Sequence, residues 1–118
     1  MRDIVPGQVY RAFARTPEER PVIVVSREEL SRGHYVVVVP CTSRRVEERK
    51  ELPNCVFFAS GEFGMTKDCV AQCEQITALL TEYLNIDSGP IATLDGTRMR
   101  DVIRAIGNAI GSDCEPLS

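Results

Sequence analysis

The residues best suited to chemistry stand at the ends of two apolar runs. Arg20 comes directly before the run 21–25, and the run 36–39 leads through a proline and a cysteine to the hydroxyls of Thr42 and Ser43. Both runs are mostly β-branched, so each predicts a strand that is buried on both faces. A guanidinium beside hydroxyl groups is suited to phosphate, because its fixed N–H groups pair with two phosphate oxygens. The pattern therefore indicates phosphodiester chemistry or RNA binding.

Arg44 and Arg45 follow these hydroxyls and open a mixed-charge stretch over 44–51. Two interpretations stay open for them: a solvated loop or edge strand, or contacts to an RNA backbone. His34 is the only histidine and would suit proton transfer. It stands at the start of a predicted strand, far in sequence from the arginines, which favours a position on the surface.

The five cysteines predict core thiols rather than a metal site. Cys69 and Cys73 are spaced to share one face of a strand, and the chain has no Cys-x-x-Cys pair of the kind that favours zinc. An odd number of cysteines, in a chain whose N-terminus lacks an apolar signal core, is typical of a reducing compartment. We therefore expect a cytoplasmic protein with free thiols, no bound metal and no cofactor.

Length and charge narrow the class of protein further. A chain of 118 residues favours one domain, which we expect over 1–118, with a core at about 6–111 and a tail at 112–118. The net charge of −3 is not the strongly basic balance of a protein that coats nucleic acid, so any RNA contact must come from a local patch. No apolar stretch approaches the roughly 18 residues of a membrane span, so we expect no membrane partner.

Alternation and turn residues predict short strands closed by one helix. The expected strands are 8–14, 21–25, 34–39 (ended by Pro40), 55–59, 68–76 with 77–80 continuing or following it, and 91–94. Ser26 and Glu29 form a capping box that predicts a helical turn at 27–30. A final helix is predicted between Asp95 as N-cap and Gly111 as stop, with one apolar face made of Met99, Val102, Ile103, Ile106 and Ile110. These elements favour a small β-barrel or curled antiparallel sheet with the helix packed across it.

In this order, the motifs resemble those of the MazF/PemK (Kid) family of toxin endoribonucleases. Five segments, spread from about Pro6 to Gly111, carry the resemblance. They are Gly7-Gln8-Val9-Tyr10, the run from Arg20 to Ser26, the corner from Val38 to Ser43, Cys73-Glu74-Gln75-Ile76, and Thr93-Leu94 with the helix that follows. No single motif is specific, but five in the right order with fitting spacings are a strong signal.

The resemblance implies a fold, an activity and partners. The family fold is mainly β with a C-terminal helix, a small SH3-like barrel of the kind shared by MazF, PemK and CcdB, and it forms a homodimer. Family members resemble metal-independent ribonucleases that cut single-stranded RNA at short sequences, and a cognate antitoxin blocks the groove. The implied products are 2′,3′-cyclic phosphate and 5′-hydroxyl ends, and the implied partners are single-stranded RNA, an antitoxin and a second copy of the chain.

By the same resemblance, Arg20 and Thr42 fall on the family's catalytic arginine and threonine. Arg20 would place N–H donors on the non-bridging phosphate oxygens, whereas a pKa above about 12 makes it a poor base. Thr42 would hold a phosphate oxygen or orient the 2′-hydroxyl. The acidic role before Arg20 falls to Glu18 or Glu19. The expected substrate-binding residues are Glu19, Ser43, Arg44, Arg45, Glu74 and Gln75.

Departures from the family pattern keep other functions open. The loop before Arg20 is shorter than the family's usual loop, and Glu74-Gln75 stands where relatives carry Asp-Gln. One alternative is a toxin of the gyrase-poison type, which shares the barrel but acts by binding a protein. Another is a non-catalytic barrel that binds RNA or an antitoxin without cleaving RNA.

Overall fold

The computed structural model describes residues 3–13 and 18–111. Residues 15–17 of the loop expected at 15–19, the tail expected at 112–118 and Cys114 lie outside this part of the chain. Within it the chain forms seven strands: β1 (Gln8–Ala12), β2 (Arg20–Val24), β3 (Tyr35–Thr42), β4 (Cys55–Phe58), β5 (Cys69–Gln72), β6 (Thr77–Leu80) and β7 (Ala92–Thr93). The helices are α1 (Glu28–Ser31), α2 (Val46–Arg49), α3 (Gly96–Ala109) and three short 3-10 turns, η1 (Glu62–Gly64), η2 (Cys73–Gln75) and η3 (Thr81–Tyr83).

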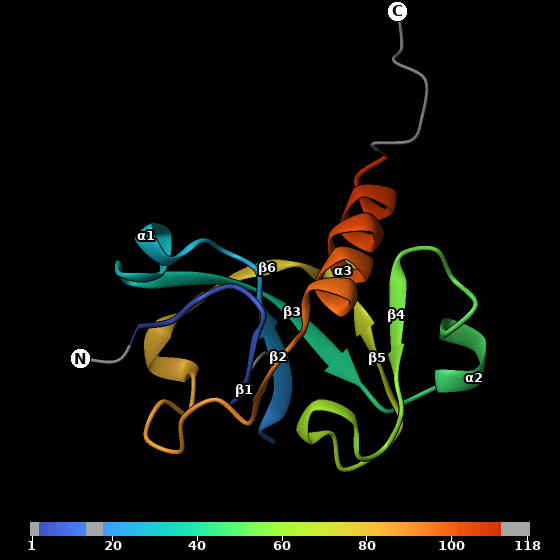
Figure 1. The fold of residues 1–118 in the computed structure, drawn as a ribbon, viewed down its shortest axis with the longest axis horizontal. Helices are drawn as coiled ribbons and strands as arrows, with labels where there is room; N and C mark the ends of the chain where they lie inside the picture. The colour runs from blue at the N-terminus through green and yellow to red at the C-terminus, as the bar shows by residue number, and fades with distance from the viewer. Residues whose placement is uncertain (1–2, 14–17, 112–118) are drawn as a thin grey trace, which may run out of the picture.

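The strands form an antiparallel sheet that curls around the long strand β3 (Figure 1). The strand order is β4-β5-β3-β2-β1-β7, and β6 pairs with β3 outside this path. One edge of β3 pairs with β2, while its other edge pairs first with β6 and then with β5. This partner change bends the sheet into a half-barrel. The prediction of a mainly β fold with a C-terminal helix is confirmed.

Pro40 lies inside β3, so the prediction that it ends the strand is wrong. The pairing of β3 with β6 stops at Val38, and its pairing with β5 starts at Cys41. A proline has no backbone N–H for a sheet ladder, and between these two pairings none is required. The strand therefore continues to Thr42 and carries the hydroxyl groups to the end of the sheet.

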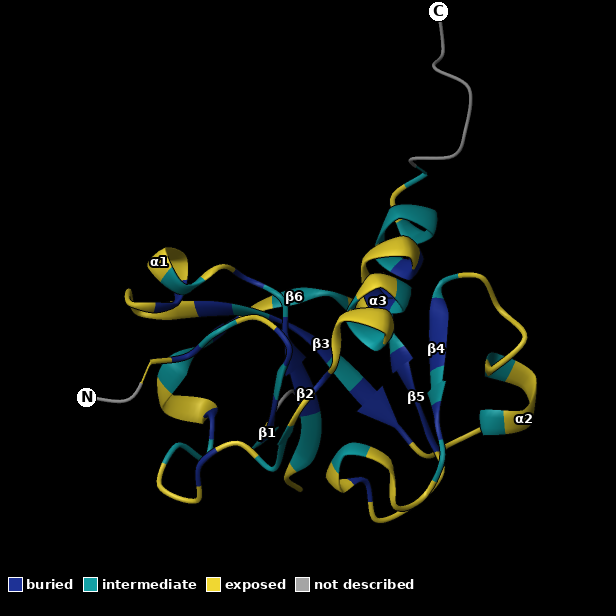
Figure 2. Cartoon of the chain, in the orientation of Figure 1, coloured by how far each residue is buried: buried dark blue, intermediate teal, exposed yellow. Residues whose placement is uncertain are grey.

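Each face of the sheet buries its own apolar cluster, and Figure 2 shows the buried residues running along β1 to β5. Successive residues of β2 alternate between the clusters: Ile23 packs in the cluster under α3, while Val22 and Val24 pack in the other. β3 does the same with Val39 and Val38. The central residues of both strands are thus buried on both faces, as their β-branched runs predict.

The start of α3 is tied to the sheet by one cap and one arginine. The Asp95 carboxylate accepts the backbone N–H of Arg98 at 2.8 Å, which confirms the predicted N-cap. The Arg98 guanidinium lies 4.5 Å from the centre of the Phe58 ring and donates to the carbonyl oxygen of Phe57. It also pairs with Asp101 at 2.9 Å. These contacts hold the helix beside β4.

The buried face of α3 is narrower than predicted. Val102 and Ala105 are buried against the sheet. Ile103 and Ile110 were expected on the same face, but they are 58% and 71% exposed. Helical spacing identifies an apolar stripe, and the half-barrel covers only one side of that stripe. Among the described residues, none of the helices has the length and apolar character required to cross a membrane.

Ser26 does not cap α1, so the predicted capping box is wrong. The N-cap position is Arg27, and it has no side-chain capping hydrogen bond. The Ser26 Oγ is buried, hydrogen-bonds the Ser31 Oγ at 2.9 Å and accepts the Val37 N–H at 3.0 Å. The hydroxyl therefore joins the end of α1 to the sheet, and a contact of this kind is not visible in local spacing.

Two other segments also depart from their predicted form. The strand expected at 68–76 ends at Gln72, and residues 73–75 turn as η2 before β6 begins. Within the mixed-charge stretch 44–51, four residues form the single-turn helix α2. The two turns lie at opposite ends of the β3–β5 pair, because α2 follows the end of β3, η2 follows the end of β5, and the two strands are antiparallel.

Candidate active site

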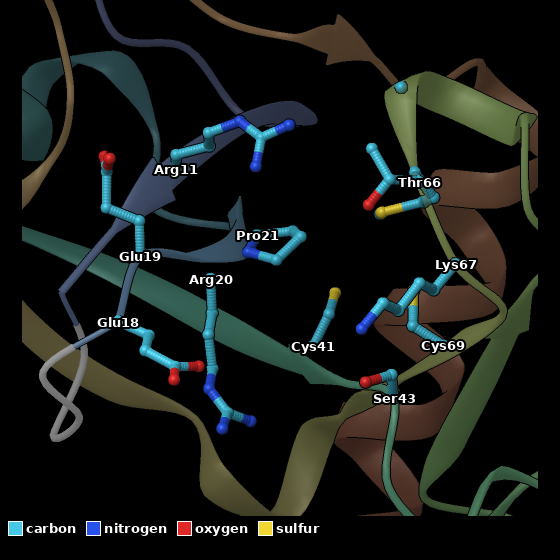
Figure 3. Close-up of a pocket in the computed structure, with 12 residues that line it drawn as sticks. Arg11, Glu18, Glu19, Arg20, Pro21, Cys41, Ser43, Thr66, Lys67 and Cys69 are labelled. Carbon is cyan, nitrogen blue, oxygen red and sulfur yellow. The ribbon is translucent and has the colours of Figure 1, made fainter.

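A pocket of about 170 Å³ lies at the end of the sheet where β3 ends and β5 begins (Figure 3). Its floor comes from neighbouring strands that present one face. Arg11 of β1 pairs with Pro21 of β2. Cys41 of β3 pairs with Ala71 of β5, and Cys69 lies on the same face of β5 as Ala71. Cys41 and Cys69 also belong to the core cluster under α3. The pocket is therefore the open end of that core.

Arg20, the first residue of β2, lines the pocket and is only partly buried. Its Nε is buried and has no hydrogen-bond partner among the described residues. A buried donor without a partner costs roughly 1–3 kcal/mol, and the described protein groups alone do not satisfy this Nε–H. An anionic ligand would supply the missing charge and acceptors.

The hydroxyls of Thr42 and Ser43 lie differently. Ser43 is exposed, lines the pocket and points its hydroxyl toward the pocket in Figure 3. Thr42 is buried, and its Oγ1 accepts the backbone N–H of Arg44 at 3.2 Å. In this structure Thr42 supports the turn that carries Ser43 and does not line the pocket wall. Its catalytic role stays a prediction.

Two carboxylates precede Arg20, and both line the pocket. The Glu19 Oε2 accepts the Asn85 Nδ2–H at 3.1 Å, and its carboxylate points away from Cys41 in Figure 3. The Glu18 carboxylate points to the same side as the Arg20 guanidinium. The acidic role that the sequence left to either residue is therefore better matched by the orientation of Glu18.

The structure does not bring the other four expected substrate contacts to this pocket. Arg44 and Arg45 are exposed in the turn before α2, where Arg45 has a left-handed φ of 53°. Glu74 and Gln75 are exposed in η2, which packs beside α3. The Glu74 Oε1 accepts a weak S–H hydrogen bond from Cys55 at 3.9 Å. The substrate contacts of these four residues stay predictions.

Among the pocket residues that were not predicted, Arg11, Thr66 and Lys67 carry a charge or a hydroxyl group. One signal could have found Arg11, because it alternates with Val9 and Phe13 and so places a charge on an apolar side of its strand. Thr66 and Lys67 lie in the loop before β5, and no pattern in the sequence indicates that this loop approaches β1 and β2.

The thiols of Cys41 and Cys69 interact on the pocket floor. Their hydrogen bond, together with burial, raises the pKa of Cys41 well above its ordinary value. The same hydrogen bond, donated by Cys41, lowers the pKa of Cys69. Cys69 is therefore the thiol of the pair that ionises more readily.

The other described cysteines behave as core thiols, as predicted. Burial raises the pKa of Cys55 to about 11 and that of Cys73 to about 12. All four cysteines in residues 3–13 and 18–111 are buried and free. Across the same residues, no group of three or more His, Cys, Asp or Glu side chains could hold a metal ion.

Comparison with models of protein families shows which family the chain belongs to. The family model described as PemK-like, MazF-like toxin of type II toxin–antitoxin system matches residues 3–110. The chain belongs to this family. Of the site residues that the resemblance implies, Arg20 and Ser43 line the pocket and Thr42 does not. No curated protein matches the chain.

Solved structures of MazF-like toxins share the fold. An endoribonuclease in complex with its cognate antitoxin, from a mycobacterial species, has a TM-score of 0.74 at 21% identity, over 98% of this chain and 99% of that one. The Mycobacterium tuberculosis toxin MazF-mt6 has a TM-score of 0.73 at 22% identity, over 88% and 96%. A MazE–MazF structure from Deinococcus radiodurans has a TM-score of 0.70 at 17% identity, over 94% and 98%. At these identities the likeness shows the fold alone.

Proposed function

We propose that this MazF-like toxin is an endoribonuclease that cleaves single-stranded RNA at the pocket of Arg20. The observation that carries the proposal is the Arg20 guanidinium, which is partly buried, unsatisfied at Nε and lines one pocket with the Ser43 hydroxyl. Three cationic and two carboxylate side chains line this pocket, whereas the whole chain has a net charge of −3. The local excess of positive charge favours an anionic ligand.

The proposed reaction is a transesterification. The 2′-oxygen of the RNA attacks phosphorus, the bond from phosphorus to the 5′-oxygen breaks, and the leaving 5′-oxygen takes a proton from water. The products are a 2′,3′-cyclic phosphate and a 5′-hydroxyl. Arg20 would donate N–H groups to the non-bridging oxygens as negative charge builds on them. The orientation of the Glu18 carboxylate toward the side of Arg20 supports it as acceptor of the 2′-hydroxyl proton. No step requires a metal ion.

We also propose that the toxin forms a homodimer and is blocked by a cognate antitoxin. Solved structures that share the fold include an endoribonuclease in complex with its cognate antitoxin. For this chain, co-purification with the product of the adjacent gene and a mass of two toxin chains would support both partners. A toxin that stays monomeric and active would exclude the dimer.

Cleavage of a long unstructured RNA in EDTA tests the proposed activity. We expect discrete fragments with 5′-hydroxyl ends, and we expect a 2′-deoxy substitution at one cut site to stop cleavage at that site only. A Glu18→Gln variant should cut more slowly and lose the acid limb of the pH profile. RNA that stays intact would contradict the proposal and favour a binding protein on the same fold.

A further inference from the structure

Two cations besides Arg20 line the pocket, and the proposed reaction does not use them. Arg11 comes from β1, and Lys67 comes from the loop between η1 and β5. The ion pairs found in residues 3–13 and 18–111 involve other cations: Arg32, Lys50 and Arg98. The charges of Arg11 and Lys67 are therefore not neutralised by a contacting carboxylate in the described chain.

The two side chains enter the pocket from opposite walls. In Figure 3 Arg11 extends from β1 toward the loop of Thr66, and Lys67 extends from that loop back toward Cys41. Arg20 stands on the strand next to Arg11, but its guanidinium points to a different part of the pocket. Arg11 and Lys67 thus face the pocket from opposite walls, and the Arg20 guanidinium points elsewhere in it.

The surroundings strengthen an interaction with an anion between Arg11 and Lys67. The buried side chains of Cys41, Met65 and Cys69 line the pocket beneath them. Sulfur and apolar groups of this kind do not compete for a charged ligand, and they lower the local dielectric response. Arg11 also stands on the sheet face of Val9, where a charge has little reason to lie unless a ligand meets it.

We propose that Arg11 and Lys67 form a second phosphate subsite, which binds the RNA backbone phosphate next to the one that Arg20 holds. This inference rests on the proposed function and extends it to the binding of the strand. The subsite contacts phosphate and therefore carries no base specificity. It positions the strand, so that the phosphate to be cut lies against Arg20. Arg11 and Lys67 are positioning residues and take no part in the bond changes.

The salt dependence of RNA binding tests the subsite directly. The probe is a single-stranded RNA with 2′-deoxy substitutions at its cut sites, so that it binds without being cleaved. Each lost phosphate contact should reduce the slope of log K against log salt by about 0.7. We expect this reduction in Arg11→Gln and in Lys67→Gln, with weaker binding at low salt, and about twice the reduction in the double variant. Lys67→Arg should keep the slope.

Matched controls are available elsewhere on the surface. Arg32 and Lys50 carry the same charges outside the pocket, in ion pairs at 3.0 Å and 2.7 Å. Arg32→Gln and Lys50→Gln should keep the slope and the affinity. In cleavage assays, Arg11→Gln and Lys67→Gln should raise KM about five- to tenfold and leave kcat at saturating RNA within about twofold, because they remove binding that is equal in the ground and transition states.

The outcomes separate the subsite from the proposed function. Equal slopes in the unaltered protein and in both pocket variants would overturn the subsite, even if the protein cleaves RNA. A fall in kcat without a change in KM would overturn it as well. Reduced slopes in a protein that binds RNA without cleaving it would support the phosphate subsite and contradict the proposed activity. Absence of RNA binding by the unaltered protein would overturn both.

Discussion

Arg20 and Thr42 stand on the same face of two paired strands. The antiparallel register of β2 and β3 pairs Val22 with Pro40, and Arg20 and Thr42 each lie two residues beyond that pair, toward the same end of the sheet. The two residues of the motif are therefore brought together by the sheet and not by their spacing in the sequence. The Thr42 hydroxyl is already occupied by the Arg44 N–H at 3.2 Å, and the next residue, Ser43, reaches the pocket.

This arrangement predicts that Thr42 acts through the turn it supports. Thr42→Val removes the acceptor of the Arg44 N–H, so it should lower the free energy of unfolding by about 1 kcal/mol and slow RNA cleavage. Thr42→Ser keeps the hydroxyl and should retain most of both. Denaturant unfolding and cleavage rates measure the two effects. A Thr42→Val protein with full stability but no cleavage would indicate direct contact with RNA instead.

The left-handed backbone of Arg45 predicts an unusual response to glycine. Arg45 has φ 53° and ψ 39°, a conformation that costs a non-glycine residue about 1–2 kcal/mol. Arg45→Gly should relieve this strain, whereas Arg44→Gly, at a residue without positive φ, should only add flexibility to the unfolded chain. Urea unfolding should find Arg45→Gly about 1 kcal/mol more stable than Arg44→Gly. The reverse order would show that the Arg45 side chain makes a stabilising contact.

The N-cap of α3 should contribute measurably to stability. Asp95→Ala leaves the Arg98 N–H without its acceptor at 2.8 Å, and the expected loss is about 1 kcal/mol. Asp95→Ser restores a capping oxygen and should recover most of the loss. Thermal unfolding of the two variants beside the unaltered protein provides the comparison. Equal losses in both variants would mean that the negative charge, rather than the cap, is what stabilises the helix.

The thiol pair on the pocket floor predicts a pH-dependent reaction. The pKa of Cys69 is lowered chiefly because the Cys41 S–H donates to it, so Cys69 should be alkylated at lower pH than Cys41. Cys41→Ala removes the donor, raises the pKa of Cys69 and should shift its alkylation profile to higher pH. Peptide mapping after iodoacetamide treatment across pH 6–10 would measure the shift. An unchanged profile in Cys41→Ala would contradict the donated hydrogen bond.

Much of the fold was predictable because local patterns determine it. The β-branched runs around Ile23 and Val39 specify strands buried on both faces, and Asp95 marks the start of the closing helix. The prediction that Pro40 ends its strand failed because the effect of a proline depends on which strands pair beside it. The change of partner along β3 is a tertiary property. The prediction that Ser26 caps the helical turn failed for a similar reason, because its hydroxyl accepts a hydrogen bond from Val37 of β3.

The site was predictable only in part. Motif order identified Arg20 and Ser43, which share the pocket, whereas the positions of Glu74 and Gln75 in η2 depend on where β5 stops. Lys67 was missed because it comes from a loop, and local sequence does not say which strands a loop approaches. Arg11 left one signal in the sequence, because it places a charge on an apolar face of its strand.

The central claim is that the Arg20 guanidinium stabilises the charge that develops on phosphate during RNA cleavage. Its most direct test is the single-turnover cleavage rate, at saturating RNA, of Arg20→Ala, Arg20→Lys and the surface control Arg32→Ala. Loss of one such donor costs about 10²–10³-fold in rate, so Arg20→Ala should fall by this factor while still binding RNA. Arg20→Lys should recover only part of the rate, because lysine lacks the planar fork, and Arg32→Ala should match the unaltered toxin. Cleavage by Arg20→Ala at the rate of the control would contradict the account.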